Sequence, residues 1–181
     1  MQLVEEKHRE SIFKQKFDNH HLLNDGQRDR KRLEVLDWLM AKLKSVMFNF
    51  HERAFKNTIN DCVRICLVAK SLIDKTLFFR SHLMLGVLYL KLDFFKESRQ
   101  VFDLIKDVSD ECHNWGQAMQ AYEWIGHVLS AQHDHDNAIK AYKKMMQLAW
   151  ETNIPEYEVK SYHNLAKQYF YLQFIEKASF Y

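Results

Sequence analysis

Two series of small residues recur every 40 positions in the second half of the chain: Gly86, Gly126 and Ala166, and, twelve positions after each, Ser98, Ala138 and Ala178. Both glycines stand in apolar runs with helical spacing, "HLMLGVLY" and "YEWIGHVL". A glycine inside a helix costs about 1 kcal/mol relative to alanine. The close packing of two helices repays this cost, because buried apolar area contributes ~25 cal/mol per Å². The spacing therefore predicts repeated helix pairs that touch at small residues.

Larger residues surround the small ones at constant offsets. The second copy reads Tyr122-x2-Ile125-Gly126-x2-Leu129, followed by Ala138-x3-Tyr142. This pattern resembles the tetratricopeptide repeat, W-x2-L-G-x2-Y…A-x3-F. The resemblance implies an all-α fold, a right-handed tetratricopeptide-like α-solenoid of antiparallel helix pairs. The period is longer than the common one of about 34 residues, and it resembles that of cell-polarity adaptors and of tetratricopeptide proteins in motile cilia.

Composition supports helices without strands. The chain has four glycines and one proline among 181 residues, whereas a β-rich protein needs turn residues every 8–12 positions. We expect an N-terminal extension over 1–28 and a helical repeat domain over 29–181. The first pair, over about 30–73, is degenerate, because Val46 stands where the repeat has glycine.

The expected helices of the other pairs are 76–91 and 94–109, 114–131 and 135–151, and 155–172 with an incomplete partner from Phe174. Asp93 is the expected N-cap of the second helix, Asp134 or Asp136 that of the fourth, and Pro155 fits a first turn. Six extra residues are expected between the second helix of one pair and the first helix of the next, where one of these two helices is longer and the connection carries its own cap. At the last pair, either the chain continues or another protein covers the apolar end.

Within the family, the first helix of each pair lines a concave groove. Carried over by register, the resemblance implies a partner-binding groove of ten residues: Arg80, Leu83, Val87, Lys91, Glu123, His127, Lys160, His163, Lys167 and Phe170. The small residues Gly86, Ser98, Gly126, Ala138, Ala166 and Ala178 are the expected packing positions. The groove is apolar at one end and basic and aromatic at the other, which favours protein segments or helices with acidic and apolar side chains.

A subclass of the family binds the C-terminal carboxylate of chaperones. It needs lysine and asparagine at positions 5 and 9 of one repeat and asparagine at position 6 of the next. This chain has Leu83, Val87 and Trp124 there, which argues against such a role.

No catalytic residue, cofactor site or metal site is predicted. The sequence has no phosphate-binding glycine loop and no recognisable nucleophile–base set. "HDHD" at 133–136 is interpreted as a helix-capping turn, with an opportunistic metal site as the alternative, because two histidines give at most half a tetrahedral zinc site. Cys62 and Cys66, one helical turn apart, are interpreted as core side chains, with a metal pair as the alternative.

Charge argues against nucleic acid as a partner. The segment 1–32 accounts for the whole net charge of +2, and a neutral body lacks the basic face that nucleic acids need. The run "RDRKR" at 28–32 is interpreted as solvated surface, with a nuclear signal or an acidic partner as alternatives. No apolar run reaches the length of a membrane span, and three cysteines without a signal segment indicate a reduced, cytoplasmic protein.

We therefore expect a non-enzymatic protein-interaction scaffold that is a subunit of a multi-protein complex and binds partners through its groove and its ends. The resemblance to ciliary proteins extends this to a location in the cilium or axoneme. The alternative is a peptide-sensing tetratricopeptide regulatory domain.

Overall fold

The computed structural model describes residues 55–71 and 75–181, together with six single positions between 30 and 45 that are all helical. Residues 43–181 form one compact unit and residues 1–42 another. Residues 55–181 lie in the unit of residues 43–181. The expected extension, its boundary at residue 28 and most of the expected first helix lie outside the described residues.

The described part of the chain is α-helical throughout and contains no strand. Its helices are α3 (Phe55–Ser71), α4 (Lys75–Lys91), α5 (Phe95–Glu111), α6 (Trp115–Ala131), α7 (His135–Thr152), α8 (Pro155–Tyr171) and α9 (Ile175–Phe180). From α4 onward, each expected boundary lies within two residues of the observed one. The all-α prediction is confirmed.

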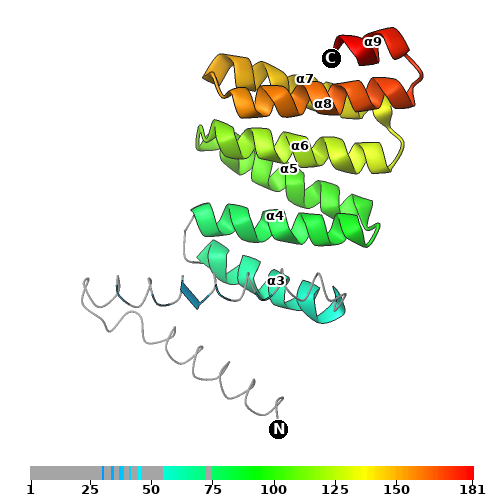
Figure 1. The fold of residues 1–181 in the computed structure, drawn as a ribbon. Helices are drawn as coiled ribbons and strands as arrows, with labels where there is room; N and C mark the ends of the chain where they lie inside the picture. The colour runs from blue at the N-terminus through cyan, green and yellow to red at the C-terminus, as the bar shows by residue number, and fades with distance from the viewer. Residues whose placement is uncertain are drawn as a thin grey trace. The chain divides into compact units, whose positions relative to one another are not determined.

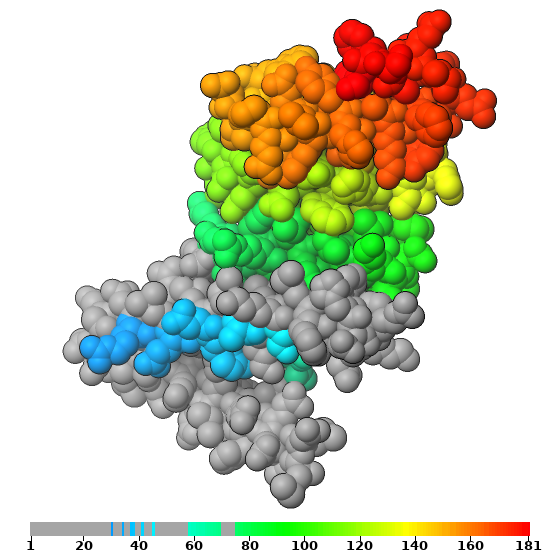
Figure 2. Space-filling model, in the orientation of Figure 1, coloured from blue at the N-terminus to red at the C-terminus, as the bar shows by residue number. Residues whose placement is uncertain are grey.

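The helices of residues 55–181 stack in chain order, each packed against the next (Figure 1). The space-filling view shows the same order from α4 onward as successive bands in contact (Figure 2). In addition, α4 contacts α6, and α6 contacts α8. The first helices of successive pairs thus approach one another directly, as expected on the inner side of an α-solenoid.

Every turn from α4 to α9 has the same geometry, and the helices begin at even intervals along the chain. The turns each contain one residue with left-handed backbone, φ between 53° and 62°: Asp93, His113, His133, Asn153 and Gln173. The following amide reaches back to the carbonyl five positions earlier, as from Asn114 to Ser109 and from Asp134 to Leu129, both at 2.9 Å. This is the Schellman motif, and the residue that donates this bond is also the N-cap of the next helix.

One expected cap and the expected first-turn proline are confirmed, and the other expected cap is wrong. Asp134 caps α7, since its Oδ1 accepts from the backbone N–H of Asn137 at 3.3 Å, and Pro155 is the first residue of α8. Asp93 does not cap α5, because its φ of 61° makes it the left-handed turn residue and moves the cap to Phe94.

The residues beyond the usual repeat length lengthen the helices. This agrees with the expectation that a helix beside the connection is longer, since α5 continues to Glu111 and α7 to Thr152 while the turns stay short. A helix can absorb added residues while keeping its backbone hydrogen-bonded, whereas a longer loop would expose polar backbone groups.

Aromatic rings of the second helix in a pair lie on the glycines of the first. Gly86 and Gly126 are buried. A Cβ added to Gly86 would lie 2.5 Å from Cε1 of Phe102, and one added to Gly126 would lie 2.5 Å from Cζ of Tyr142. The rings of Phe102 and Tyr142 are themselves fully buried. Glycine is therefore required because a ring occupies the place of its side chain.

The other small residues complete these contacts. Ser98 is fully buried, and its Oγ donates to the carbonyl of Gly86 at 2.8 Å, so the backbone of α4 and the side chain of α5 are in direct contact. Ala138 takes the equivalent place in α7 and is also fully buried. Ala166 and Ala178 are half-buried.

We expect Gly126→Ala to lower the free energy of unfolding by about 1–2 kcal/mol. Overpacking a core costs roughly 1–3 kcal/mol, and the helix propensity of alanine returns at most about 1 kcal/mol. Gly116, in the first turn of the same helix, is the matched control, since its added Cβ would meet only Oδ1 of Asn114 at 3.8 Å. Gly116→Ala should therefore leave stability unchanged or raise it. Urea denaturation followed by circular dichroism measures both, and equal effects would contradict the ring-on-glycine contact.

We expect His133→Gly to raise the free energy of unfolding by up to about 1 kcal/mol. The left-handed conformation of His133 costs an ordinary L-residue roughly 1–2 kcal/mol, and glycine adopts it freely but loses more chain entropy on folding. Asn153→Gly should gain less, because asparagine tolerates this conformation. Thermal denaturation of both variants tests whether His133→Gly gains more stability than Asn153→Gly. A destabilised His133→Gly variant would contradict this prediction and show that the His133 side chain makes a stabilising contact.

Candidate protein-binding face

Positions three and four residues apart share one side of a helix, so the expected groove residues form one stripe on each of α4, α6 and α8. We call the surface formed by these ten residues the A-helix face: Arg80, Leu83, Val87, Lys91, Glu123, His127, Lys160, His163, Lys167 and Phe170. None of the ten is buried. Whether they bind a partner stays a prediction.

The character of the A-helix face changes from α4 to α8. On α4, Leu83 and Val87 are half-buried and pack against the main core. On α8, Lys167 and Phe170 are exposed, the latter to 61%. An exposed phenylalanine beside a lysine is costly in water, but it suits a partner that supplies both apolar contact and negative charge.

Glu123 of α6 is half-buried without an ion-pair partner within 4.0 Å among the described residues. Burial raises the pKa of its carboxyl group, the charge of Lys160 lowers it and that of Glu156 raises it again, with a rise as the net result. Lys160 is itself paired, since its Nζ lies 2.8 Å from Oε1 of Glu156. Glu123 therefore keeps free acceptor capacity at the middle of the A-helix face.

His127 joins α6 to α7 and is kept neutral. Its Nδ1 lies 2.8 Å from the hydroxyl of Tyr142. Burial, with repulsion from Lys167, lowers the pKa of the His127 imidazole to about 4. Burial and the charge of Glu123 raise the pKa of the Tyr142 phenol. Because both groups are neutral at pH 7, the hydroxyl can donate to Nδ1, and the other ring nitrogen then carries the proton and is a donor.

Lys167 has no carboxylate within 4.0 Å in the part of the chain that the structure describes. Its nearest recorded contact is the Tyr171 ring, whose centroid lies 5.9 Å from Nζ. A cation–π contact at an exposed site is worth only about 0.5–1 kcal/mol. Lys167 is thus an available cation at the α8 end of the A-helix face.

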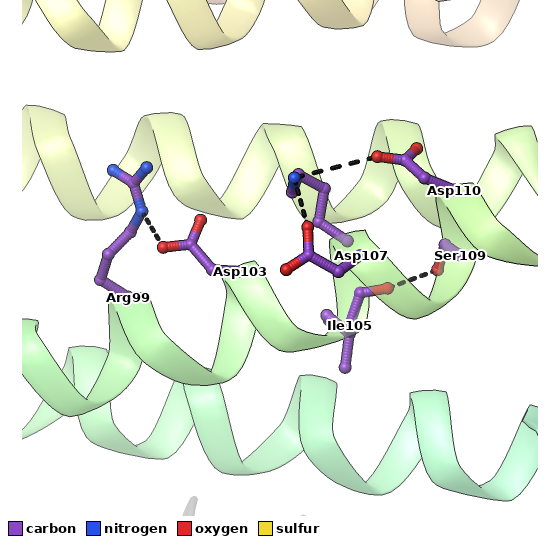
Figure 3. A network of polar contacts seen from close by, with 7 residues as sticks. Arg99, Asp103, Ile105, Asp107, Ser109 and Asp110 are labelled. Carbon is purple, nitrogen blue, oxygen red and sulfur yellow. Dashed lines mark hydrogen bonds and ion pairs between the residues drawn. The ribbon is translucent and has the colours of Figure 1, made fainter.

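On helix α5, several charged side chains are paired with one another within the helix (Figure 3). Arg99 Nε donates to Oδ2 of Asp103 at 2.9 Å, and Lys106 pairs with Asp107 and, at 3.9 Å, with Asp110. Such surface pairs contribute little to stability. Lys96, Glu97 and Glu111 of the same helix are exposed and take no part in these pairs.

The "HDHD" segment has structural roles in the turn before α7. Asp134 is the cap, His133 has the left-handed backbone, and the Nδ1–H of His135 donates to Oε1 of Gln168 on α8 at 2.8 Å. The expected turn is confirmed. Among the described residues, no three side chains of His, Cys, Asp or Glu come together as metal ligands.

The two cysteines of α3 are core side chains, as expected. Cys62 and Cys66 are buried and free, and Cys62 Sγ donates to the carbonyl of Ser81 at 3.4 Å. Its contact with Cys66, together with burial, raises the pKa of the Cys62 thiol, so this thiol stays protonated. Among the described helices, none is both long enough and apolar enough to cross a membrane.

Sequence reasoning missed two buried polar residues of α8, Asn164 and Gln168. Both stand at positions that are apolar in the preceding repeat, where Trp124 corresponds to Asn164 and Val128 to Gln168. Comparing equivalent repeat positions for changes from apolar to polar is the signal that could have found them.

The comparisons agree with this architecture. No protein-family model matches the sequence, and no curated protein is similar to it. Among solved structures, the chain is similar to the Rap conjugation gene regulator of the plasmid pLS20 in complex with the Phr* peptide, with a TM-score of 0.68 and 19% sequence identity. The match covers 86% of this chain and 42% of the regulator.

The chain has a tetratricopeptide-like helical repeat fold. At this level of identity the likeness shows the fold alone. It agrees with the stacked helices and with the resemblance of the sequence to tetratricopeptide repeats.

We expect stability to fall as the pH drops from about 6.5 to 4, through His127. The unfolded chain takes up this proton near the ordinary histidine pKa of 6.5, but the folded chain does so only near 4. Between these values the unfolded state binds more protons, which costs the fold up to about 1 kcal/mol per pH unit. In His127→Asn, an amide oxygen takes the place of Nδ1, and the melting temperature should vary less over this range. His163→Asn, an exposed position, controls for removing a histidine; an equal flattening there would contradict the assignment.

Proposed function

We propose that this protein is a non-catalytic interaction module that binds a segment of another protein, extended or helical, along its A-helix face. The segment carries apolar side chains toward α4 and an acidic side chain toward Lys167. The observation that carries the proposal is the aligned stripe on α4, α6 and α8. It is accessible throughout and changes from half-buried aliphatic residues to an exposed phenylalanine and a lysine that has no carboxylate partner in the described chain.

Energetics assign different tasks to the two ends of the A-helix face. Apolar contacts with Leu83 and Val87 would supply most of the affinity, because binding energy concentrates in desolvated apolar contacts. Arg80 and Lys91 on α4 and Lys167 on α8 would steer an acidic partner toward the face.

The role of a peptide-sensing regulatory domain is the second candidate. It is favoured by the likeness to a regulator whose solved structure contains a bound peptide. The present chain spans about two fifths of that regulator, so a regulatory output would need parts outside the matched region. A scaffold role within a larger assembly, in a cytoplasmic or ciliary setting, rests on the resemblance of the sequence to ciliary tetratricopeptide proteins.

The proposal can be tested with short random peptides displayed on phage and selected against the purified chain. We expect enriched peptides that combine an acidic residue with apolar ones, and binding that weakens as salt rises. Lys167→Glu should weaken the selected peptide about tenfold, since an attractive charge pair becomes a repulsive one.

Lys143→Glu is the matched control, because it makes the same charge change at an exposed position of α7. It should alter binding little. Equal losses in the two variants would indicate a general charge effect, and the absence of any enriched peptide would contradict the proposed function.

A further inference from the structure

Helix α3 holds two free cysteines one helical turn apart, which the proposed function does not use. Cys62 is 0% exposed and Cys66 is 5% exposed. At this spacing the two Cα atoms of a helix are about 6 Å apart, which lies within the range of roughly 4.4–6.8 Å found in disulfides. The side chains are in hydrogen-bond contact with each other. The two sulfur atoms are therefore placed so that they can be joined.

An imidazole of the next helix lies against Cys66. Helix α4 packs on α3 (Figure 1), and the side chain of His82 on α4 is hydrogen-bonded to that of Cys66. The Nδ1 of His82 lies 2.8 Å from the carbonyl oxygen of Phe78. Because a carbonyl oxygen only accepts, Nδ1 carries the proton, and in the neutral ring Nε2 is the acceptor. His82 is thus oriented to take the thiol proton of Cys66.

These contacts make the two thiols unequal. The contact with Cys62, aided by hydrogen bonds to His82 and Ser81, lowers the pKa of the Cys66 thiol against the opposing effect of burial. The contact with Cys66, together with burial, raises the pKa of the Cys62 thiol. A thiolate is the nucleophile, whereas an ordinary buried thiol is inert. Cys66 is therefore the nucleophile of the pair, and it is also the more exposed of the two.

We propose that Cys66 and Cys62 are a site of oxidation by hydroperoxides, at which Cys66 reacts first and Cys62 closes a disulfide within α3. This inference goes beyond the proposed function and does not depend on the A-helix face. The oxidant is small and needs no binding pocket. Among the described residues no three metal-ligating side chains come together, so the geometry favours oxidation of the pair over metal binding.

The reaction has two steps. In the first, His82 takes the proton of Cys66 and the thiolate attacks an oxygen of the hydroperoxide. The O–O bond breaks, Cys66 becomes a sulfenic acid, and the other oxygen takes up the proton and leaves as water or an alcohol. In the second, the Cys62 sulfur attacks the sulfenic sulfur, the S–O bond breaks, and the Cys62 proton leaves with that oxygen as water. Two thiols are oxidised and one hydroperoxide is reduced.

Oxidation would change the contact between α3 and α4. The Cys62 thiol donates to the carbonyl of Ser81 on α4 at 3.4 Å, and a disulfide has no S–H with which to do so. The hydrogen bond between Cys66 and His82 changes in the same reaction. Since His82 precedes Leu83 of the A-helix face, the redox state of the pair acts on the helix that carries the apolar end of that face.

The test treats the folded full-length chain with one equivalent of hydrogen peroxide, blocks the remaining thiols and digests the chain with trypsin. Trypsin cuts after Arg64, between the two cysteines, so mass spectrometry detects their disulfide as two peptides joined through sulfur. We expect this product to form at least about tenfold faster than any oxidation of Cys112, because reactivity follows thiolate character. Cys112, in the turn after α5, is the matched control, since it is more exposed than either cysteine of the pair.

Two outcomes of this experiment would overturn the proposal. Oxidation of Cys112 before the pair would show that exposure alone decides reactivity. A preference for the pair that persists in urea would show that the fold does not activate Cys66. The expected result in urea is oxidation of all three cysteines at similar rates.

Substitutions test the order of the two steps. Cys62→Ala should leave a sulfenic acid on Cys66 that dimedone traps, whereas Cys66→Ala should leave Cys62 reduced. Equal oxidation of Cys62 in the Cys66→Ala variant would contradict the assigned order. Circular dichroism checks that each variant is folded.

The role of His82 has its own readout. His82→Gln should slow the oxidation of Cys66 about tenfold and move its pH dependence toward the ordinary thiol pKa of about 8.5. The pH profile of the wild-type chain is a second measurement that needs no variant. There, oxidation of Cys66 should stay fast at a pH of about 6.5, where that of Cys112 has slowed. Parallel pH profiles for the two cysteines would overturn the proposal.

Discussion

In the pairs α4–α5 and α6–α7, the spacing between the two helices is set by an aromatic ring that lies on a glycine backbone. Phe102 on Gly86 and Tyr142 on Gly126 occupy the volume of the missing side chains, and each ring is itself fully enclosed. Because a close-packed interior cannot yield by even a methyl group without cost, these contacts fix how α5 lies on α4 and how α7 lies on α6.

The turns impose a second constraint, which acts along the chain. Each has one left-handed residue, and the donor of the long turn hydrogen bond is also the cap of the next helix. Asn114 and Asp134 cap through their side chains, whereas Phe94 packs its ring edge-on against Tyr89, 6.3 Å away. Different side chains thus support one backbone geometry. The helices α4, α6 and α8 have the same length and begin 40 residues apart. Equivalent positions on the three helices therefore lie next to one another, and their stripes form one surface.

Much of this fold can be predicted from periodicity, and the failures have physical reasons. The glycine and alanine series located the helix pairs because close packing leaves a size limit that any sequence must obey. The turns were predicted less well, since a left-handed residue is usually glycine or asparagine, and here aspartate, histidine and glutamine take that role. For the face, helix register predicted which positions are accessible. It did not indicate that His127 would bind Tyr142 or that Asn164 would lack a partner in the described chain, because both depend on a neighbouring helix.

Under the proposed function, the same repeat position contacts the core on α4 and offers a cation to a partner on α8. Val87, His127 and Lys167 are equivalent by register, and they change from an aliphatic side chain in contact with the core to a neutral imidazole and then to an available cation. A chain selected for stability alone would repeat the aliphatic residue in every pair. The polar groups of α6 and α8 lower stability where they stand, and such local departures from good packing are expected at functional sites. The rigid α4–α5 pair and the polar α6–α8 surface are in this sense two parts of one arrangement, in which the first holds the second in place.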